Sequence, residues 1–160
     1  MQYSDADALS KALTDGSLDM AAPVSASTAT GLNGKDGLTV KEWATTDKVL
    51  LAYNNGTDSL LSDEQARKAF RYQIDAAGIA SAQPDAAGAL GGPISLLEPG
   101  YEDLTGLYPH DENQAGQMFS YFGAQYLTTV NLVVPEEYRS LAETIKQQIE
   151  RQPRPTVNLE

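Results

Sequence analysis

Cysteine is absent from this chain of 160 residues, and histidine occurs once, at His110. Without cysteine there is no disulfide framework, no thiolate zinc site and no cysteine nucleophile. One histidine cannot supply the paired ligands of a two-histidine metal site. No apolar run approaches the ~18 residues that a membrane-spanning helix requires, so we expect no membrane insertion.

Positive charge is scarce and unevenly placed. Lys and Arg number 11 against 22 Asp and Glu, so the formal net charge is −11. Between Arg71 and Arg139 there is no Lys or Arg, whereas acids recur throughout that stretch. Such a chain repels polyphosphate and favours a basic partner surface, so we expect a protein partner and no nucleic acid. The alternative is a solvated acidic face whose carboxylates cap turns and helix starts.

Apolar periodicity and capping residues predict a mainly α-helical small domain of about five helices with a minor β element. The β-branched run at 128–134 is the strongest strand signal, and the short apolar run at 94–97 predicts either a second β element or a buried turn. The sequence leaves three partners for the strand at 128–134: residues 94–97, an N-terminal segment, or a second chain in a homo-oligomer. The expected helices cover 4–14, 40–53, 63–77, 112–127 and a segment that starts at Pro135. Ser4, Thr39 and Ser62 stand where N-cap residues belong.

The stretch 79–93 is rich in Ala, Gly and Pro, which is typical of a boundary between units. We expect an N-terminal helical unit at 1–78, a linker or loop at 79–93 and a C-terminal helix–strand–helix unit at 94–158, unless all of these form one compact domain. Residues 19–31 are small and polar and contain Pro23, so they predict a loop. The final Leu159-Glu160 is typical of residues left by cloning, and we leave both out of the expected fold.

Acids and tyrosines gather between residues 98 and 121, and this gathering is the candidate partner-binding surface. Tyrosine beside carboxylates is a composition typical of protein interfaces. The competing interpretation places the aromatic side chains of this segment in the core. The candidate residues are Glu98, Tyr101, Glu102, Asp103, Tyr108, Asp111, Glu112 and Tyr121.

No constellation of side chains indicates catalysis. His110 adjoins Asp111, but neighbours in sequence rarely orient each other as a catalytic pair, and no nucleophile-elbow serine occurs. There is no P-loop and no dinucleotide-binding glycine pattern. We therefore expect no enzyme, no cofactor and no metal site.

Two segments resemble known families. Residues 33–42 contain Asp36-Gly37, then an apolar residue, and end at Glu42. In this order they resemble a degenerate calcium loop of the EF-hand type.

In residues 32–79, the spacing of Gly34, Gly37, Val40 and Trp43 is similar to the opening of the small helical peptidoglycan-binding domain of bacterial cell-wall proteins. Tyr72-Gln73 with Gly78 matches the end of that domain. Ala44, Thr46 and Asp47 depart from that pattern. The second resemblance implies a helical module that binds cell-wall glycan.

The sequence as a whole predicts a non-catalytic acidic module for protein–protein interaction, of bacterial or phage origin. An assembly component, an adaptor, and an inhibitor or immunity protein that binds a basic surface all fit this prediction. The alternatives are a peptidoglycan-binding module and a degenerate EF-hand-like calcium binder. The start of the chain has no signal peptide, and the compartment stays open between the cytoplasm and, if a signal was removed before Met1, the periplasm.

Overall fold

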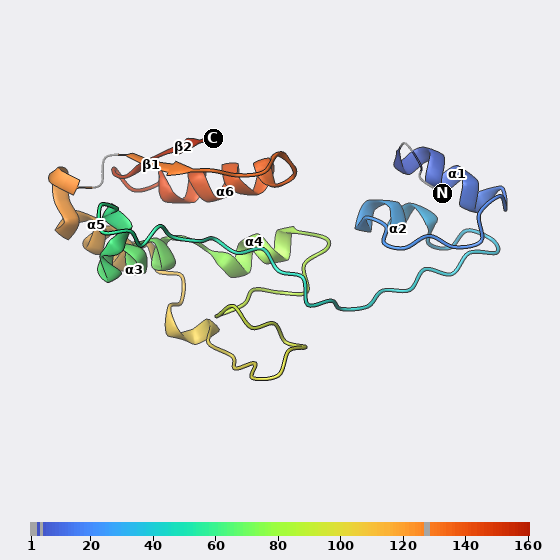
Figure 1. Cartoon of the computed structure of the whole chain (residues 1–160), viewed down its shortest axis with the longest axis horizontal. Helices are drawn as coiled ribbons and strands as arrows, with labels where there is room; N and C mark the ends of the chain where they lie inside the picture. The colour runs from blue at the N-terminus through green and yellow to red at the C-terminus, as the bar shows by residue number, and fades with distance from the viewer. Residues whose placement is uncertain (1–2, 4, 127–128) are drawn as a thin grey trace. The chain divides into compact units, whose positions relative to one another are not determined.

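The computed structural model describes residues 3, 5–126 and 129–160, without the side chains of 122–126 (Figure 1). Contacts within the chain divide it into two compact units. Unit 1 comprises residues 1–45 and 83–87, and unit 2 comprises residues 46–82 and 88–160. This grouping differs from the expected division at 79–93, because residues 46–82 pack with the C-terminal part of the chain rather than with the N-terminus.

Unit 1 contains two short helices, α1 (Ala6–Thr14) and α2 (Ala26–Leu32). Asp5 caps α1 by accepting from the Ala8 N–H at 2.7 Å, while the expected cap Ser4 lies outside the described residues. The loop predicted at 19–31 is wrong over its second half, where α2 forms. Two side chains accept hydrogen bonds from the main-chain N–H groups at the start of α2. The Ser25 hydroxyl accepts from Thr28, and the Asp85 carboxylate accepts from Ala26 at 2.9 Å.

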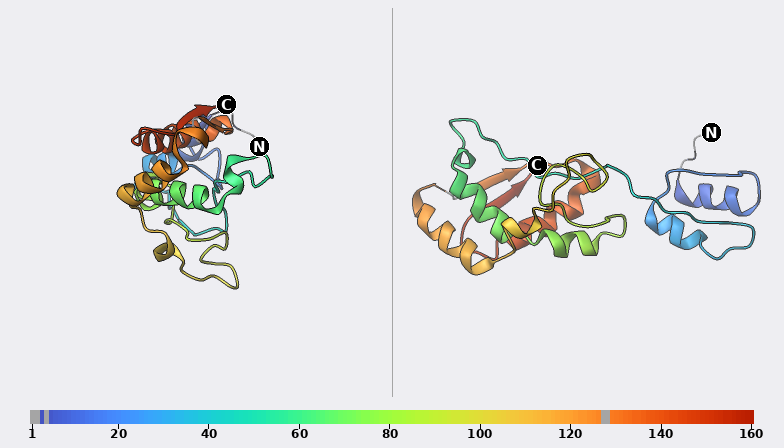
Figure 2. Two further views of the ribbon diagram at one scale, coloured as in Figure 1. Left: turned by 90° about the vertical axis from the view of Figure 1, so that its left-hand side faces the viewer. Right: turned by 90° about the horizontal axis from the view of Figure 1, so that it is seen from below.

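Unit 2 contains the helices α3 (Glu64–Gln73), α4 (Ala76–Ala82), α5 (Glu112–Tyr126) and α6 (Arg139–Ile149). Single turns of 3-10 helix occur at η1 (Leu60–Ser62), η2 (Thr105–Leu107) and η3 (Glu136–Tyr138). Helix α3 packs along α5, and α6 packs on the small sheet (Figure 2). The core lies where these elements meet and consists of Ala69, Phe70, Ala115, Phe119, Ile149 and Val157.

The sheet consists of two parallel strands, β1 (Thr129–Leu132) and β2 (Thr156–Leu159), in the part of the chain that the structure describes. The strand predicted at 128–134 is confirmed over 129–132, and Thr128 lies outside the described residues. The β element expected at 94–97 is wrong, because the Glu98 N–H donates to the Ser95 carbonyl at 2.9 Å and closes a turn there. The alternative of a turn is confirmed, although Leu96 and Leu97 are exposed rather than buried. Setting Leu159-Glu160 aside was also wrong, since Leu159 pairs with Leu132 and packs against the core. The mainly helical fold with a minor β element is confirmed.

The helix expected at 40–53 does not form, and residues 38–57 run without regular secondary structure. Thr45, Thr46 and Asp47 in its middle have poor helix propensity. The apolar residues Val49, Leu50 and Leu51 follow one another instead of recurring three or four positions apart, so they do not make one helical face. All three are exposed.

The helix expected at 63–77 is confirmed for α3 and then divides at Ile74. Asp63, one residue after the expected cap Ser62, caps α3 by accepting from the Gln65 N–H at 2.7 Å. The Asp75 carboxylate accepts from the Gly78 N–H at 2.8 Å, which is the N-capping geometry that starts α4. Gly78 therefore belongs to a second helix and does not terminate the first one.

A buried glutamine joins the helices of unit 2. Gln73, at the end of α3, is fully buried and donates from Nε2 to the Gln148 carbonyl of α6 at 2.6 Å. The Gln73 Oε1 accepts from Gln152 Nε2 at 2.9 Å. Gln152 Nε2 also donates to the Glu112 carbonyl of α5 at 3.0 Å. This network fixes α3, α5 and α6 relative to one another. Of the helices that the structure describes, none is long and apolar enough to cross a membrane.

Candidate functional site

The eight candidate residues do not form one surface. Four of them lie in the segment 94–107, which we call the acidic loop: Glu98, Tyr101, Glu102 and Asp103. Of the next three, Tyr108 directly follows η2, Asp111 precedes α5 and Glu112 is its first residue. Tyr121 lies on α5 nine residues beyond Glu112, which is half a rotation around the helix and about 13 Å along it.

Glu98 anchors the acidic loop to the extended segment that precedes α3. Its carboxylate forms an ion pair with Lys48, whose ammonium also donates to the Pro93 carbonyl at 2.8 Å. The same carboxylate accepts from the Ser95 N–H at 2.7 Å. The Lys48 ammonium, followed by the Ser95 N–H, lowers the pKa of Glu98 from its ordinary 4.5 to about 2. Glu98 is therefore an internal contact, and its charge is already matched within the chain.

The depressed pKa of Glu98 predicts a specific loss of stability in acid. Ionised Glu98 stabilises the fold above pH 4.5, and this contribution disappears as the pH falls from 4.5 through about 2. In urea unfolding, the difference in stability between wild type and Glu98→Gln should shrink across that window. Glu102→Gln, at an exposed position of the same loop, is the control and should show a smaller change. A difference for Glu98→Gln that does not vary with pH would contradict the ion pair.

Glu102 and Asp103 are the exposed acids of the acidic loop. Asp103 accepts from both the N–H and the hydroxyl of Thr105, at 3.0 and 2.6 Å, and these bonds lower the pKa of its carboxyl group. Gly91, three residues before the acidic loop, packs against its far end, where a Cβ at residue 91 would lie only 2.2 Å from the carbonyl carbon of Leu104. Figure 1 shows this loop as the yellow segment between α4 and α5. The acidic loop also exposes large apolar side chains, namely those of Ile94, Leu96, Leu97 and Leu107.

Tyr108, Asp111 and Glu112 make structural contacts at the junction of α3 and α5. The Tyr108 ring packs edge-on against Tyr72 at 5.7 Å, and the Arg71 guanidinium lies 5.8 Å from the Tyr108 ring centre. Asp111 caps α5 by accepting from the Gln114 N–H at 2.9 Å. Glu112 forms an ion pair with Arg151 at 2.6 Å and lies 3.6 Å from the imidazole of His110. A hollow of about 250 Å³ at this junction is lined by Tyr53, Glu64, Arg67, Lys68, Arg71 and Tyr108.

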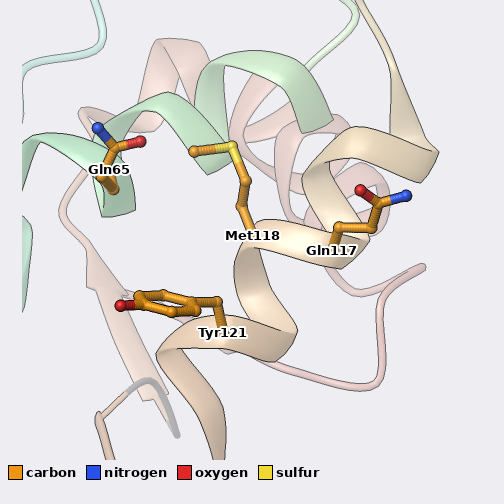
Figure 3. Close-up of a pocket in the computed structure, with 4 residues that line it drawn as sticks. All are labelled: Gln65, Gln117, Met118 and Tyr121. Atoms are coloured by element: carbon orange, nitrogen blue, oxygen red, sulfur yellow. The ribbon is translucent and has the colours of Figure 1, made fainter.

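Tyr121 is highly exposed and borders an open hollow of about 400 Å³ between α3 and α5. Figure 3 shows Met118 of α5 reaching toward Gln65 of α3, with Tyr121 one helical turn further along α5; Gln117 completes the lining. This hollow has no charged lining residue among the side chains described there. Tyr121 therefore belongs to a polar and apolar recess rather than to the acidic loop.

Residues 72–138 contain no Lys or Arg, but basic side chains from other parts of the chain contact them in the folded structure. Lys48, Arg71 and Arg151 come from outside the stretch and contact Glu98, Tyr108 and Glu112 respectively. Other acids of the stretch serve as caps, namely Asp75, Asp85 and Asp111. The sequence prediction found the acids but missed these cations, as well as the exposed leucines of the acidic loop. Leucine repeated inside a segment that also contains Pro99, Gly100 and Gly106 was the available signal.

Comparison with protein-family models, curated proteins and solved structures found no match. Function is therefore inferred from this chain's own residues. Among the described residues, no group of three His, Asp or Glu side chains is placed to hold a metal ion. The acidic loop can offer a partner two adjacent carboxylates beside exposed leucines.

Proposed function

We propose that this chain is a non-catalytic interaction module whose acidic loop binds a basic surface on a partner protein. The observation that carries the proposal is the exposure of Glu102 and Asp103 on the same loop as Leu96 and Leu97, which are 67% and 53% exposed. Exposed apolar patches rimmed by polar residues mark protein–protein interaction sites. An adaptor or inhibitor would use such a segment.

The two kinds of side chain have different roles in this proposal. The leucines provide the apolar area whose burial stabilises the complex, at about 25 cal/mol per Å². The carboxylates steer a basic partner into place and raise the association rate, an effect that weakens as salt screens the charges. The ion pair between Lys48 and Glu98 and the close approach at Gly91 restrain the loop before binding, which lowers the entropy lost in the complex.

Reversing the two exposed charges tests the proposal. The double variant Glu102→Lys with Asp103→Lys should lose at least about tenfold in capture of a basic partner from a lysate of the native host, because attraction becomes like-charge repulsion. The matched control is Glu136→Lys with Glu137→Lys, which reverses two adjacent exposed acids in η3. Affinity purification with quantitative mass spectrometry measures the captured protein.

The control should capture the partner as the wild type does, and added salt should lower the amount of partner captured by the control and by the wild type. Equal loss in the two double variants would mean that only net charge matters, and would remove the acidic loop from the proposal. Asp111 is left unchanged because it caps α5, and its reversal would mix binding with folding.

Binding of peptidoglycan through residues 32–79 stays a prediction from the sequence resemblance. A pull-down on purified peptidoglycan tests it, with Trp43→Ala as the variant because Trp43 is 66% exposed. No retention of the wild type, or equal retention of both proteins, would remove this alternative for the segment around Trp43.

A further inference from the structure

Strand β1 has one paired edge and one unpaired edge. The Val134 N–H donates to the Glu160 carbonyl at 2.9 Å, and the Glu160 N–H donates to the Leu132 carbonyl at 3.0 Å. Main-chain N–H and C=O groups alternate in direction along a parallel strand, so the main-chain groups of Val130, Leu132 and Val134 point toward β2. The main-chain groups of Thr129, Asn131 and Val133 then point away from β2. Within the described part of the chain, no third strand pairs with them.

The two strands of the sheet have the same sequence, Thr-Val-Asn-Leu, and pair residue for residue. On the exposed face, the hydroxyls of Thr129 and Thr156 are 3.3 Å apart, and Asn158 Nδ2 donates to Asn131 Oδ1 at 3.2 Å. Asparagine ladders stabilise stacked strands, and threonine pairs stabilise neighbouring strands. The structure thus contains one example of this tetrapeptide pairing with a copy of itself, in the parallel direction.

The outer edges of the two strands differ. At β2, the Glu150 carboxylate accepts from the Val157 N–H at 2.8 Å and occupies that edge. At β1, the outward residues Thr129, Asn131 and Val133 are uncharged, and all three are exposed. Natural edge strands are protected by lysine, proline, a bulge, a covering segment or a very short strand. Strand β1 is short, at four residues, but it pairs with β2 in an unbroken register, and 129–133 contains no lysine and no proline.

We propose that the outer edge of β1 pairs with β1 of a second copy of this chain, antiparallel across a two-fold axis at Asn131. Asn131 then faces Asn131 of the second copy, and Thr129 faces its Val133. The two sheets become one continuous four-stranded sheet, and the outward N–H and C=O groups gain partners. A two-fold axis gives a closed dimer, because each edge is used once. This inference is independent of the acidic loop.

A pair of matched substitutions tests the dimer. Asn131→Asp places two carboxylates opposite each other at the axis, whereas Asn158→Asp adds the same charge on β2, away from the axis. Asn131 and Asn158 occupy the same position of the repeated tetrapeptide and share a side-chain hydrogen bond. Asn131→Asp keeps the acceptor Oδ1 of this bond, whereas Asn158→Asp removes its donor Nδ2, so the control disturbs the β1–β2 pair at least as much. Sedimentation velocity over a concentration series should give a dimer for the wild type. The dissociation constant should rise at least about tenfold for Asn131→Asp and change little for Asn158→Asp.

A second variant keeps the test valid if Asn131→Asp fails to fold. Val133→Pro removes only the outward N–H of residue 133 and leaves the β1–β2 hydrogen bonds in place. It should also weaken the dimer. A wild type that stays monomeric at the highest concentration overturns the proposal, and so does a dimer that Asn131→Asp and Asn158→Asp weaken equally.

Discussion

Replacement of Gln73 by leucine should lower the free energy of unfolding by about 2–4 kcal/mol, although leucine is the more apolar residue. Gln73 is fully buried and makes two side-chain hydrogen bonds, to the Gln148 carbonyl and from Gln152 Nε2. Leucine satisfies neither group. A buried polar group that loses its partner costs about 1–3 kcal/mol, and here two groups each lose one of two partners. Gln152 Nε2 keeps the Glu112 carbonyl and the Gln148 carbonyl keeps the Arg151 N–H at 3.4 Å, so the total lies in the lower half of the summed range. For a domain whose stability is typically about 5–15 kcal/mol, such a loss is large.

The matched control is Gln147→Leu. Gln147 lies on α6 beside Gln148 but is exposed, so the same chemical change should alter stability by less than about 0.5 kcal/mol. Urea unfolding followed by circular dichroism measures both variants. If Gln73→Leu is as stable as Gln147→Leu, the glutamine network does not hold α3, α5 and α6 together.

Local signals predicted much of the helical content, because capping and periodicity act within one or two turns. The pattern of Ala115, Met118 and Phe119 located α5, and Pro135 with Glu136 and Glu137 located the helix that follows β1. The helix expected at 40–53 failed because its capping pattern was not followed by one apolar face. Propensity at a helix start does not compensate for a missing face, since most helical stability in proteins comes from packing.

The partner of β1 could not be predicted from composition, because pairing joins residues 27 positions apart. One signal was present: the tetrapeptide at 129–132 recurs at 156–159. The candidate surface met a similar limit. Counting acids along the sequence cannot show that Lys48 and Arg151 reach Glu98 and Glu112, since those contacts depend on the tertiary fold.

Gly91→Ala should displace the acidic loop and lower the free energy of unfolding by about 1–3 kcal/mol. A Cβ at residue 91 would lie 2.2 Å from the Leu104 main-chain carbon and 2.4 Å from the Thr105 nitrogen. Main-chain atoms cannot rotate away as a side chain can, so one side of the loop must move. The displaced segment includes Glu102 and Asp103, and capture of a basic partner should therefore fall with the same substitution.

Gly92→Ala is the matched control for this prediction. Its Cβ would meet only the Leu104 Cδ1 atom, at an ordinary contact distance of 3.6 Å. Stability and partner capture should both stay near wild type for Gly92→Ala. Retained capture by a destabilised Gly91→Ala would show that the binding residues act without the folded loop, whereas unchanged stability would contradict the close approach of residue 91 to Leu104.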